Sequence, residues 1–335
     1  MPGSYVVPEA YRAKWGKYLP HQRLNVDQVP LPFVNDFDTT YNERGDKARV
    51  AIQAGGPSLS KRQATGQVCF RPVVPPEAWC TDDATRVAYK KALMEQPAPC
   101  IIFRGQKCPK QEEADAYPDG LVVLWQPKAW VDRPTAQAWA DQVIKPFIAA
   151  ERAAQVADGT SRYLLFQDNL DSQKQPDYLN ALKAALPTHP HAHTHTHTHR
   201  PHTSPSQHTH PNAPVMQSVG VDDHKVPPNE TDQVQPIDRG MGRQIKVYLG
   251  QLLDEWLDDE DNLEKWESNK LTASDRRILL AHWFYKASMK ALQGEAKRKY
   301  FEHAGALLTA DGTDDDLIKL EGAPAGYKVV IPQLT

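Results

Sequence analysis

Three aspartates stand among neighbours that make them candidates for chemistry. They are Asp27 in NVDQVP, Asp168 in LLFQDN and Asp238 in PPNETDQVQPIDRG. Carboxylates that are far apart in a sequence can converge in a fold, and together they provide the hard oxygen ligands that Mg²⁺ prefers. Divalent ions held in this way promote displacement reactions at phosphorus. The three segments therefore indicate metal-dependent chemistry on phosphates.

The composition leaves the number of domains open but restricts how the chain could bind nucleic acid. The chain has 335 residues, 40% of them apolar and 24% charged, which is enough to bury the core of one large or two ordinary domains. Its net charge of −3 argues against binding nucleic acid through bulk charge, so DNA affinity would need a local basic patch or a separate domain. The 28 prolines indicate many loops.

The cysteines and the N-terminus predict an intracellular protein with reduced thiols. Cys69, Cys80, Cys100 and Cys108 form no Cys-x-x-Cys pair, so a zinc site made from them is not expected. The N-terminal residues lack the features of a secretory signal. No apolar stretch approaches the roughly 20 residues that span a bilayer, so no contact with a membrane is expected.

The elements that must position the aspartates are predicted from apolar runs and turn residues. Strands are expected at Leu24–Asp27, Leu31–Val34, Arg49–Ile52, Gln67–Val74, Cys100–Phe103 and Leu121–Trp125. A modest helical stretch covers residues 9–19, and helical spacing of apolar residues predicts a longer helix from Asp132 to Ala150. The compact run Tyr163–Phe166 is typical of a central strand, and Asp168 follows its C-terminal end, where ligands commonly bind.

The second half contains a low-complexity stretch followed by two helices. Residues 187–225 carry alternating His and Thr and scattered prolines, which predict a disordered insertion. Its histidines could bind Zn²⁺ or Ni²⁺ loosely, but a low-complexity expansion explains the pattern more simply. Helices are expected to start near Asp238 and to run over about Ser274–Gln293, and the acidic stretch Asp254–Asp261 between them reads as solvated surface.

The helix that opens at Asp238 carries basic residues as well. A carboxylate in the first turn is favoured by the helix dipole. Arg239, Arg243 and Lys246 follow at positions i, i+4 and i+7, which would place them in one stripe. The stripe is either a track for DNA phosphates beside the metal ions or a solvated helix face.

In this order, the segments resemble the DDE superfamily endonuclease domain of mariner and pogo-type transposases. The likeness covers roughly residues 20–290 and is carried by the three aspartate segments together with Arg62–Val68 and Ile101–Gly105. By this resemblance Asp27 matches the first acidic residue of the family, Asp168 the second and Asp238 the third. Asp36 and Asp38 are nearby competitors for the first role, but they lack the Asp-Gln-x-Pro context of Asp27.

The resemblance implies an α/β fold, an RNase H-like mixed β-sheet flanked by helices and interrupted by the disordered His/Thr/Pro-rich insertion. It implies a DNA endonuclease and strand transferase in which Asp27, Asp168 and Asp238 hold two Mg²⁺ ions, with Mn²⁺ as a substitute, roughly 3.5 to 4 Å apart. DNA is the expected partner, a homodimer is left open, and the expected location is the nucleus. The alternative is a catalytically silent derivative that binds nucleic acid or protein.

The expected domain organisation departs from the family in two places. Residues 21–186 and 226–293 form the two parts of the catalytic domain, residues 1–20 an N-terminal remnant or linker helix, and residues 294–335 a C-terminal tail. No convincing strand is predicted over Val219–Lys225, so the fifth core strand of the family is expected to be missing. Only a short segment precedes Asp27, so the helix-turn-helix domains that read the ends of an element are not expected.

Overall fold

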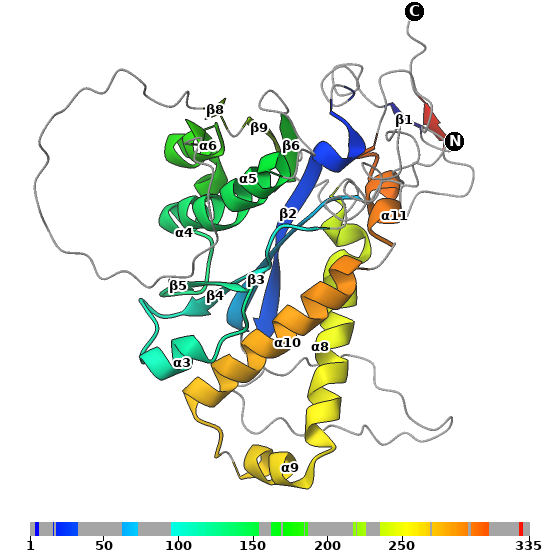
Figure 1. Cartoon of the computed structure of the whole chain (residues 1–335). Coiled ribbons are helices and arrows are strands. Elements are labelled where there is room, and N and C mark those ends of the chain that lie inside the picture. The colour runs from blue at the N-terminus through cyan, green and yellow to red at the C-terminus, as the bar shows by residue number, and fades with distance from the viewer. Residues whose placement is uncertain are drawn as a thin grey trace, which may run out of the picture.

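The fold is organised around a six-stranded mixed sheet in the order β5-β4-β3-β2-β6-β9 (Figure 1). The structure, a computed structural model, describes residues 4–6, 16, 18–32, 62–72, 95–153, 162–168, 170–183, 185–186, 217–218, 220–225, 235–268, 270–293, 296–307 and 328–330. The strands of the sheet are β2 (Arg23–Pro32), β3 (Arg62–Phe70), β4 (Cys100–Arg104), β5 (Val122–Gln126), β6 (Tyr163–Gln167) and β9 (Val221–Lys225).

Strand direction brings several carboxyl ends to one edge of the sheet. β3 is antiparallel to both of its neighbours, β2 and β4, whereas β2 and β6, β6 and β9, and β4 and β5 are parallel pairs. β3 is therefore the one strand of this sheet that runs against the rest. The ends of β6 and β9 lie beside the middle of the long strand β2, because Val26 pairs with Gln167 and Gln167 pairs with Lys225.

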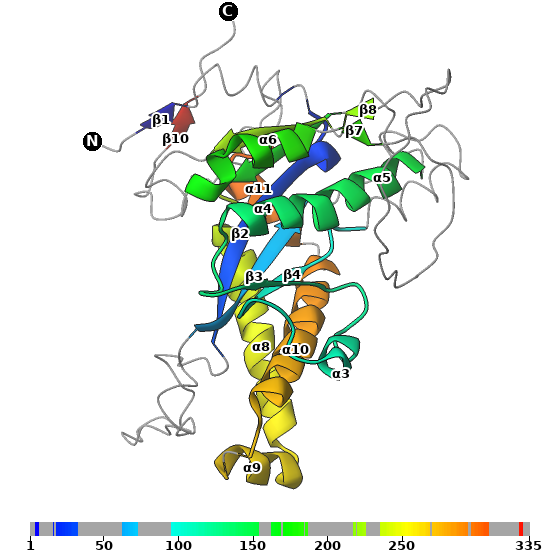
Figure 2. The ribbon, with the colours of Figure 1, turned by 90° about the vertical axis from the view of Figure 1, so that its left-hand side faces the viewer.

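One face of the sheet is covered by the C-terminal helices. They are the π-helical turn η5 (Ile237–Met241), α8 (Gly242–Leu257), α10 (Ala273–Gln293) and α11 (Ala296–His303). Alternate residues of the strands, such as Val29, Phe103 and Phe166, pack there against Ile245 and Phe284. α8 and α10 run side by side beyond the sheet, with α9 (Glu260–Glu267) at their far end (Figures 1 and 2).

The opposite face is covered by helices from the middle of the chain. α4 (Arg133–Trp139), the π-helical stretch η3 (Ala140–Ile144) and α5 (Lys145–Ala153) follow one another without a break, and α6 (Pro176–Lys183) lies beside them. The helix predicted from Asp132 is thereby confirmed. Asp132 caps its start, because its side chain accepts a hydrogen bond from the backbone N–H of Thr135. Trp139 and Ile148 are completely buried against strand residues such as Val26 and Leu165.

Shorter elements complete the described part of the chain. They are β1 (Ser4–Val6), which pairs in parallel with β10 (Lys328–Val330), β7 (Ala185–Leu186), which is antiparallel to β8 (Gln217–Ser218), the single turns η1 (Pro20–Gln22) and η4 (Asp171–Lys174), and α3 (Gln111–Asp115). None of the helices in these ranges combines the length and the apolar character that a membrane crossing requires.

The expectation that no strand forms over Val219–Lys225 is wrong. β9 pairs with β6 along its whole length, Val221 is fully buried, and the His224 ring meets Phe166 edge to face. The strand escaped prediction because its two central residues, Asp222 and Asp223, are polar. Asp222 is held by an ion pair with Arg162, so the strand is stabilised by partners from elsewhere in the chain. The predicted insertion of residues 187–225 is therefore too long at its C-terminal end.

Other expectations are corrected in detail or lie outside the described residues. Part of the expected C-terminal tail is folded, because Phe301 of α11 packs edge to face on Phe70 of β3. The acidic side chains of Asp254–Asp261 are exposed, as expected. The predicted strand Arg49–Ile52, most of the predicted helix over residues 9–19, the alternative aspartates at positions 36 and 38, Cys80 and the His-Thr repeat all fall outside the described residues.

Candidate functional site

The register of β2 and β6 places Asp27 and Asp168 beside each other. Val26 pairs with Gln167, so the two aspartates occupy the next position on neighbouring parallel strands, where backbones lie about 5 Å apart. Side chains alternate along a strand, and Asp27 shares the parity of Val29 while Asp168 shares that of Phe166. Val29 and Phe166 both pack beneath α8 and α10. The two aspartates therefore belong to the face that the C-terminal helices cover.

Asp238 reaches this face through η5. The buried residue Ile237 donates its backbone N–H to the side-chain oxygen of Asn25, at 2.8 Å. The side chain of Gln235 donates to the backbone carbonyl of Val26, at 3.3 Å. These two hydrogen bonds fasten the start of η5 directly to the part of β2 that carries Asp27. Asp238 itself is exposed to solvent.

The electrostatics of Asp27 show that the three aspartates share one environment. Burial raises the pKa of the Asp27 carboxyl from 3.8 to about 7, a hydrogen bond from the backbone of Gln28 opposes the rise, and the negative charges of Asp238 and Asp168 add to it. Residues from three distant segments thus act on one carboxyl group. The two carboxylates disfavour a third negative charge beside them.

The three carboxylates do not form a recognisable metal centre in this structure. Among the residues that the structure describes, no group of three or more His, Cys, Asp or Glu side chains is placed as a metal-ligand cluster. The donor set nevertheless fits a hard divalent cation, because it offers carboxylate oxygens only and because a cation would relieve the repulsion around Asp27.

The predicted basic stripe is not a single exposed row. Arg239 is buried, and its guanidinium donates to the backbone carbonyl of His303 in α11. The backbone of Gly240 has a φ of 149°, which breaks the helical geometry between Arg239 and α8, so the spacing of i and i+4 does not apply across it. Arg243 is exposed and Lys246 is half-buried on α8. Of the three residues, these two remain accessible to a ligand.

Lys225 is a further basic residue near the aspartates, which the sequence analysis did not single out. It ends β9 and pairs in register with Gln167, the residue before Asp168. Its ammonium group donates to the carbonyl of Gln173 at 2.7 Å and lies 3.5 Å from a carboxylate oxygen of Asp223. Burial lowers the pKa of Lys225, while the carboxylates of Asp223 and Asp168 act in the opposite direction. Correct prediction of β9 would have revealed it.

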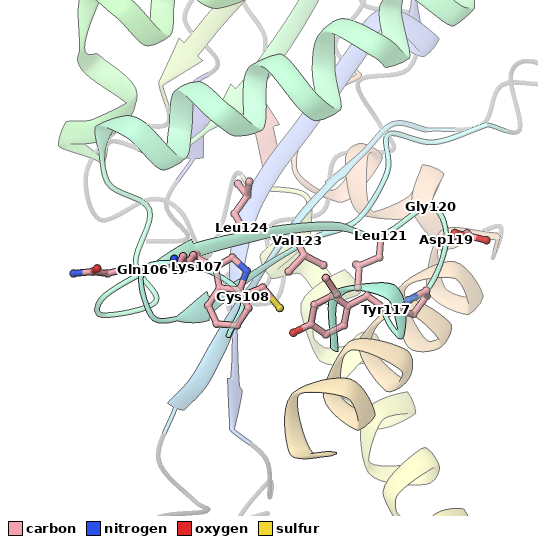
Figure 3. Close-up of a pocket in the computed structure, with 12 residues that line it drawn as sticks. Gln106, Lys107, Cys108, Tyr117, Asp119, Gly120, Leu121, Val123 and Leu124 are labelled. Carbon is pink, nitrogen blue, oxygen red and sulfur yellow. The ribbon is translucent and has the colours of Figure 1, made fainter. Parts of the chain in front are cut away.

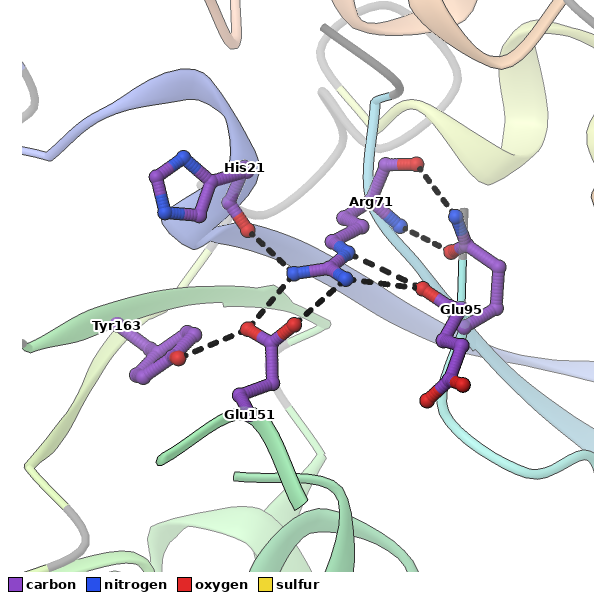
Figure 4. A network of polar contacts seen from close by, with 6 residues as sticks. His21, Arg71, Glu95, Glu151 and Tyr163 are labelled. Carbon is purple, nitrogen blue, oxygen red and sulfur yellow. Dashed lines mark hydrogen bonds and ion pairs between the residues drawn. The ribbon is translucent and has the colours of Figure 1, made fainter. Parts of the chain in front are cut away.

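A second polar cluster lies on the opposite face and holds the fold together (Figure 4). The buried guanidinium of Arg71 pairs with Glu151 of α5 at 2.7 Å and donates to backbone carbonyls of His21 and Glu95. The hydroxyl of Tyr163 donates to the same carboxylate at 2.8 Å. Burial, with the charge of Arg71 acting in the same direction, lowers the pKa of His21 to about 3, so its imidazole is neutral.

An open surface pocket of about 620 Å³ lies at the β5 edge of the sheet (Figure 3). Its wall includes Cys108, Tyr117 and Trp125. The thiol of Cys108 donates to the carbonyl of Lys110, and the hydroxyl of Tyr117 donates to Glu113. β4 and β3 separate this edge from β2, so the pocket does not include the aspartates.

Comparison of the chain with models of known families, with curated proteins and with solved structures finds no match.

Proposed function

We propose that the chain is a metal-dependent DNA endonuclease and strand transferase of the mariner and pogo transposase type, with an RNase H-like catalytic domain. The observation that carries the proposal is geometric: the register of β2 and β6 sets Asp168 beside Asp27, and two hydrogen bonds from the start of η5 to β2 bring Asp238 to the same part of the sheet. The negative charges of Asp168 and Asp238 raise the cost of ionising the partly buried Asp27 beside them. A cation bound between these carboxylates would offset that cost.

The order of the strands supports the same proposal. The strands β4, β3, β2, β6 and β9, with β3 alone reversed, follow the arrangement expected of an RNase H-like sheet, and β5 is an additional strand at its edge. The first aspartate is then on the central strand, the second at the end of its parallel neighbour, and the third on the helical segment packed over both. Asp27 lies within β2 and not at the strand end that the sequence analysis expected, whereas Asp168 follows β6 and Asp238 lies in the turn that precedes α8.

In this proposal Asp27, Asp168 and Asp238 hold Mg²⁺ or Mn²⁺. Bound ions of this kind activate an attacking oxygen and stabilise the charge that develops on the leaving oxygen of a phosphodiester. The carboxyl oxygens of Asp27 give up a proton near neutral pH, because the pKa of this group is about 7. Arg243 and Lys246, both on α8, supply the local positive charge that a chain of net charge −3 needs for binding DNA phosphates.

Nicking of supercoiled plasmid tests the proposal. Incubation with Mg²⁺ or Mn²⁺ is expected to nick the plasmid, and Asp168→Asn is expected to slow nicking roughly 100-fold or more, because a direct ligand matters at least as much as the groups that orient it. The matched control is Asp171→Asn, three positions along the chain, whose carboxylate is 95% exposed. The proposal fails if the wild-type chain shows no metal-dependent nicking or if both variants nick equally.

A catalytically silent, DNA-binding derivative is the second candidate. It is favoured by the absence of a formed metal-ligand cluster among the described residues. A gel-shift assay on the same DNA separates the two candidates. Binding that is indifferent to Mg²⁺, together with no nicking under any divalent ion, would support the silent derivative.

A further inference from the structure

A buried side-chain amide connects the three segments that carry the aspartates. Asn25 is fully buried on β2, two residues before Asp27. Its amide NH₂ donates to the carbonyl of Phe166 at 3.1 Å, two residues before Asp168. Its amide oxygen accepts the backbone N–H of Ile237 at 2.8 Å. Asp238 is the next residue after Ile237, so one side chain contacts the backbone beside both other aspartates.

A second buried amide reinforces the connection to η5. The NH₂ group of Gln235 donates to the carbonyl of Val26, the residue between Asn25 and Asp27. Both amides are fully buried, where a hydrogen bond is stronger than in water and an unmade one is costly. We call the pair of side chains, Asn25 and Gln235, the amide clasp.

The amide clasp completes the start of η5: the backbone carbonyl of Gln235 accepts the N–H groups of Asp238 and Arg239, and the N–H of Ile237 goes to Asn25. The N–H groups of the first turn of a helix have no partner within the helix, and the residue at the N-cap position, Pro236, makes no side-chain cap. Asn25 supplies the missing acceptor from a strand far away in the sequence. Asn25 thereby ties the residue before Asp238 to β2, while the N–H of Asp238 itself is held by the carbonyl of Gln235.

The ladder between β2 and β6 does not need this amide. Backbone pairing already sets the register of Arg23–Val26 against Leu164–Gln167. A leucine in place of Asn25 would avoid the desolvation of a polar group. An aspartate would keep the acceptor but would set a negative charge against the carbonyl of Phe166. The amide side chain serves both partners at once, as donor to one and as acceptor for the other.

We propose that the amide clasp is a positioning device that fixes Asp238 and Asp168 relative to Asp27. The proposal rests on the proposed function, because it assigns the amides to the same metal site. Asn25 and Gln235 would touch neither metal nor DNA, and they would act through the backbone next to the aspartates that would hold the metal. Groups that orient metal ligands typically change metal affinity 10 to 100-fold when they are removed.

The test uses two measurements on the full chain. Hydrogen exchange of the backbone amides of residues 235–241 reports how firmly η5 is held, and titration with Mn²⁺ reports the assembled site. Asn25→Ala is expected to speed exchange at residues 235–241 roughly tenfold or more and to weaken Mn²⁺ binding roughly 10 to 100-fold. Gln235→Met, which keeps the length of the side chain but loses the donor, is expected to act in the same direction more weakly.

The matched control is Asn262→Ala. The amide of Asn262 also donates to a backbone carbonyl, that of Trp256 at 3.1 Å, but it lies in α9. This variant is expected to leave both measurements unchanged. If Asn25→Ala does not fold, Gln235→Met and its effect on the same two measurements decide the question.

The outcomes separate the amide clasp from the proposed function. Unchanged Mn²⁺ affinity in both amide variants overturns the positioning role, as does faster exchange spread evenly over β2, β6 and η5. Local loosening of η5 in the variants, combined with a wild-type chain that binds no Mn²⁺, overturns the proposed function while the mechanical link from Asn25 to Asp238 stands.

Discussion

The carboxyl group of Asp27 meets opposite requirements from folding and from the proposed chemistry. Folding places it in a partly buried position beside Asp168 and Asp238, which favours the protonated form. Binding a cation requires the ionised form. Because its pKa is about 7, the Asp27 carboxyl group loses its proton near neutral pH, and a cation can then bind the ionised group.

The raised pKa of Asp27 predicts a pH-dependent gain in stability for Asp27→Asn. A folded-state pKa above the usual 3.8 means that the protonated group contributes stability below pH 3.8, and that this contribution is lost as the pH rises through about 7. The variant stays neutral at every pH. Its free energy of unfolding relative to the wild type is therefore expected to increase between pH 4 and pH 8, by roughly 2 to 4 kcal/mol.

Urea unfolding in the absence of divalent ions, repeated across this pH range, measures the effect. Asp171→Asn serves as the control, because its carboxylate is 95% exposed and its replacement is expected to shift stability little at any pH. A constant difference between Asp27→Asn and the wild type from pH 4 to pH 8 would show that Asp27 is not held in the environment described above.

The turn η5 depends on a glycine. Gly240 has a φ of 149°, which other residues rarely adopt, and a Cβ atom there would lie 2.4 Å from a ring carbon of Tyr300. α11 therefore approaches η5 closely only because position 240 has no side chain. This contact and the hydrogen bond from Arg239 to His303 make α11 a support for the segment that carries Asp238.

Gly240→Ala is expected to destabilise the chain by roughly 1 to 4 kcal/mol, from backbone strain together with the displaced Tyr300 ring. Gly242→Ala is the matched control two positions away. Its φ of −61° is helical, and its added Cβ would meet no atom closer than 3.7 Å. That variant is expected to be neutral or more stable by up to about 1 kcal/mol. Thermal unfolding of the two variants side by side decides, and equal melting temperatures would refute the close contact.

The strands show which elements could be predicted from the sequence. Cys100–Phe103 and Tyr163–Phe166 are recognisable as apolar runs because a strand in the interior of a sheet is covered on both faces. Leu121–Trp125 is also an apolar run, although β5 lies at the edge of the sheet. β9 has polar residues at its centre and depends on β6 and on Arg162, which lie elsewhere in the chain. The local sequence of β9 carries no information about the residues elsewhere in the chain that pair with it.

The same limit applies to the candidate site. The three aspartates stand out by their neighbours in the sequence, but the amide clasp does not, because its donors and acceptors are brought together only by the fold. Arg239 is predicted to be part of the candidate site, but the fold removes it from the surface. Helical spacing places it in a stripe with Arg243, and one glycine with a positive φ turns it into the interior. The helical spacing of residues in a sequence does not show where a single residue breaks the helical backbone geometry.

At the scale of the whole molecule, two layers of helices are attached to one sheet in different ways. The C-terminal helices meet it through a large apolar cluster. The layer of α4, α5 and α6 adds the buried pair of Arg71 and Glu151, whose side chains are 0% and 3% exposed. Arg71 follows β3 and Glu151 belongs to α5, while Tyr163 starts β6. This one carboxylate therefore joins a helix to two strands.

Glu151→Gln is expected to reduce the free energy of unfolding by roughly 3 to 5 kcal/mol, because it leaves the buried guanidinium of Arg71 without its counter-charge. Asp177→Asn is the natural comparison. It breaks the pair of Arg133 and Asp177, whose side chains are 54% and 55% exposed, and exposed pairs contribute about 1 kcal/mol or less. Urea unfolding at pH 7, followed by tryptophan fluorescence and by circular dichroism, measures both losses. Similar losses for the two variants would mean that water reaches Arg71 and that the sheet and its helical layer are held together by apolar packing alone.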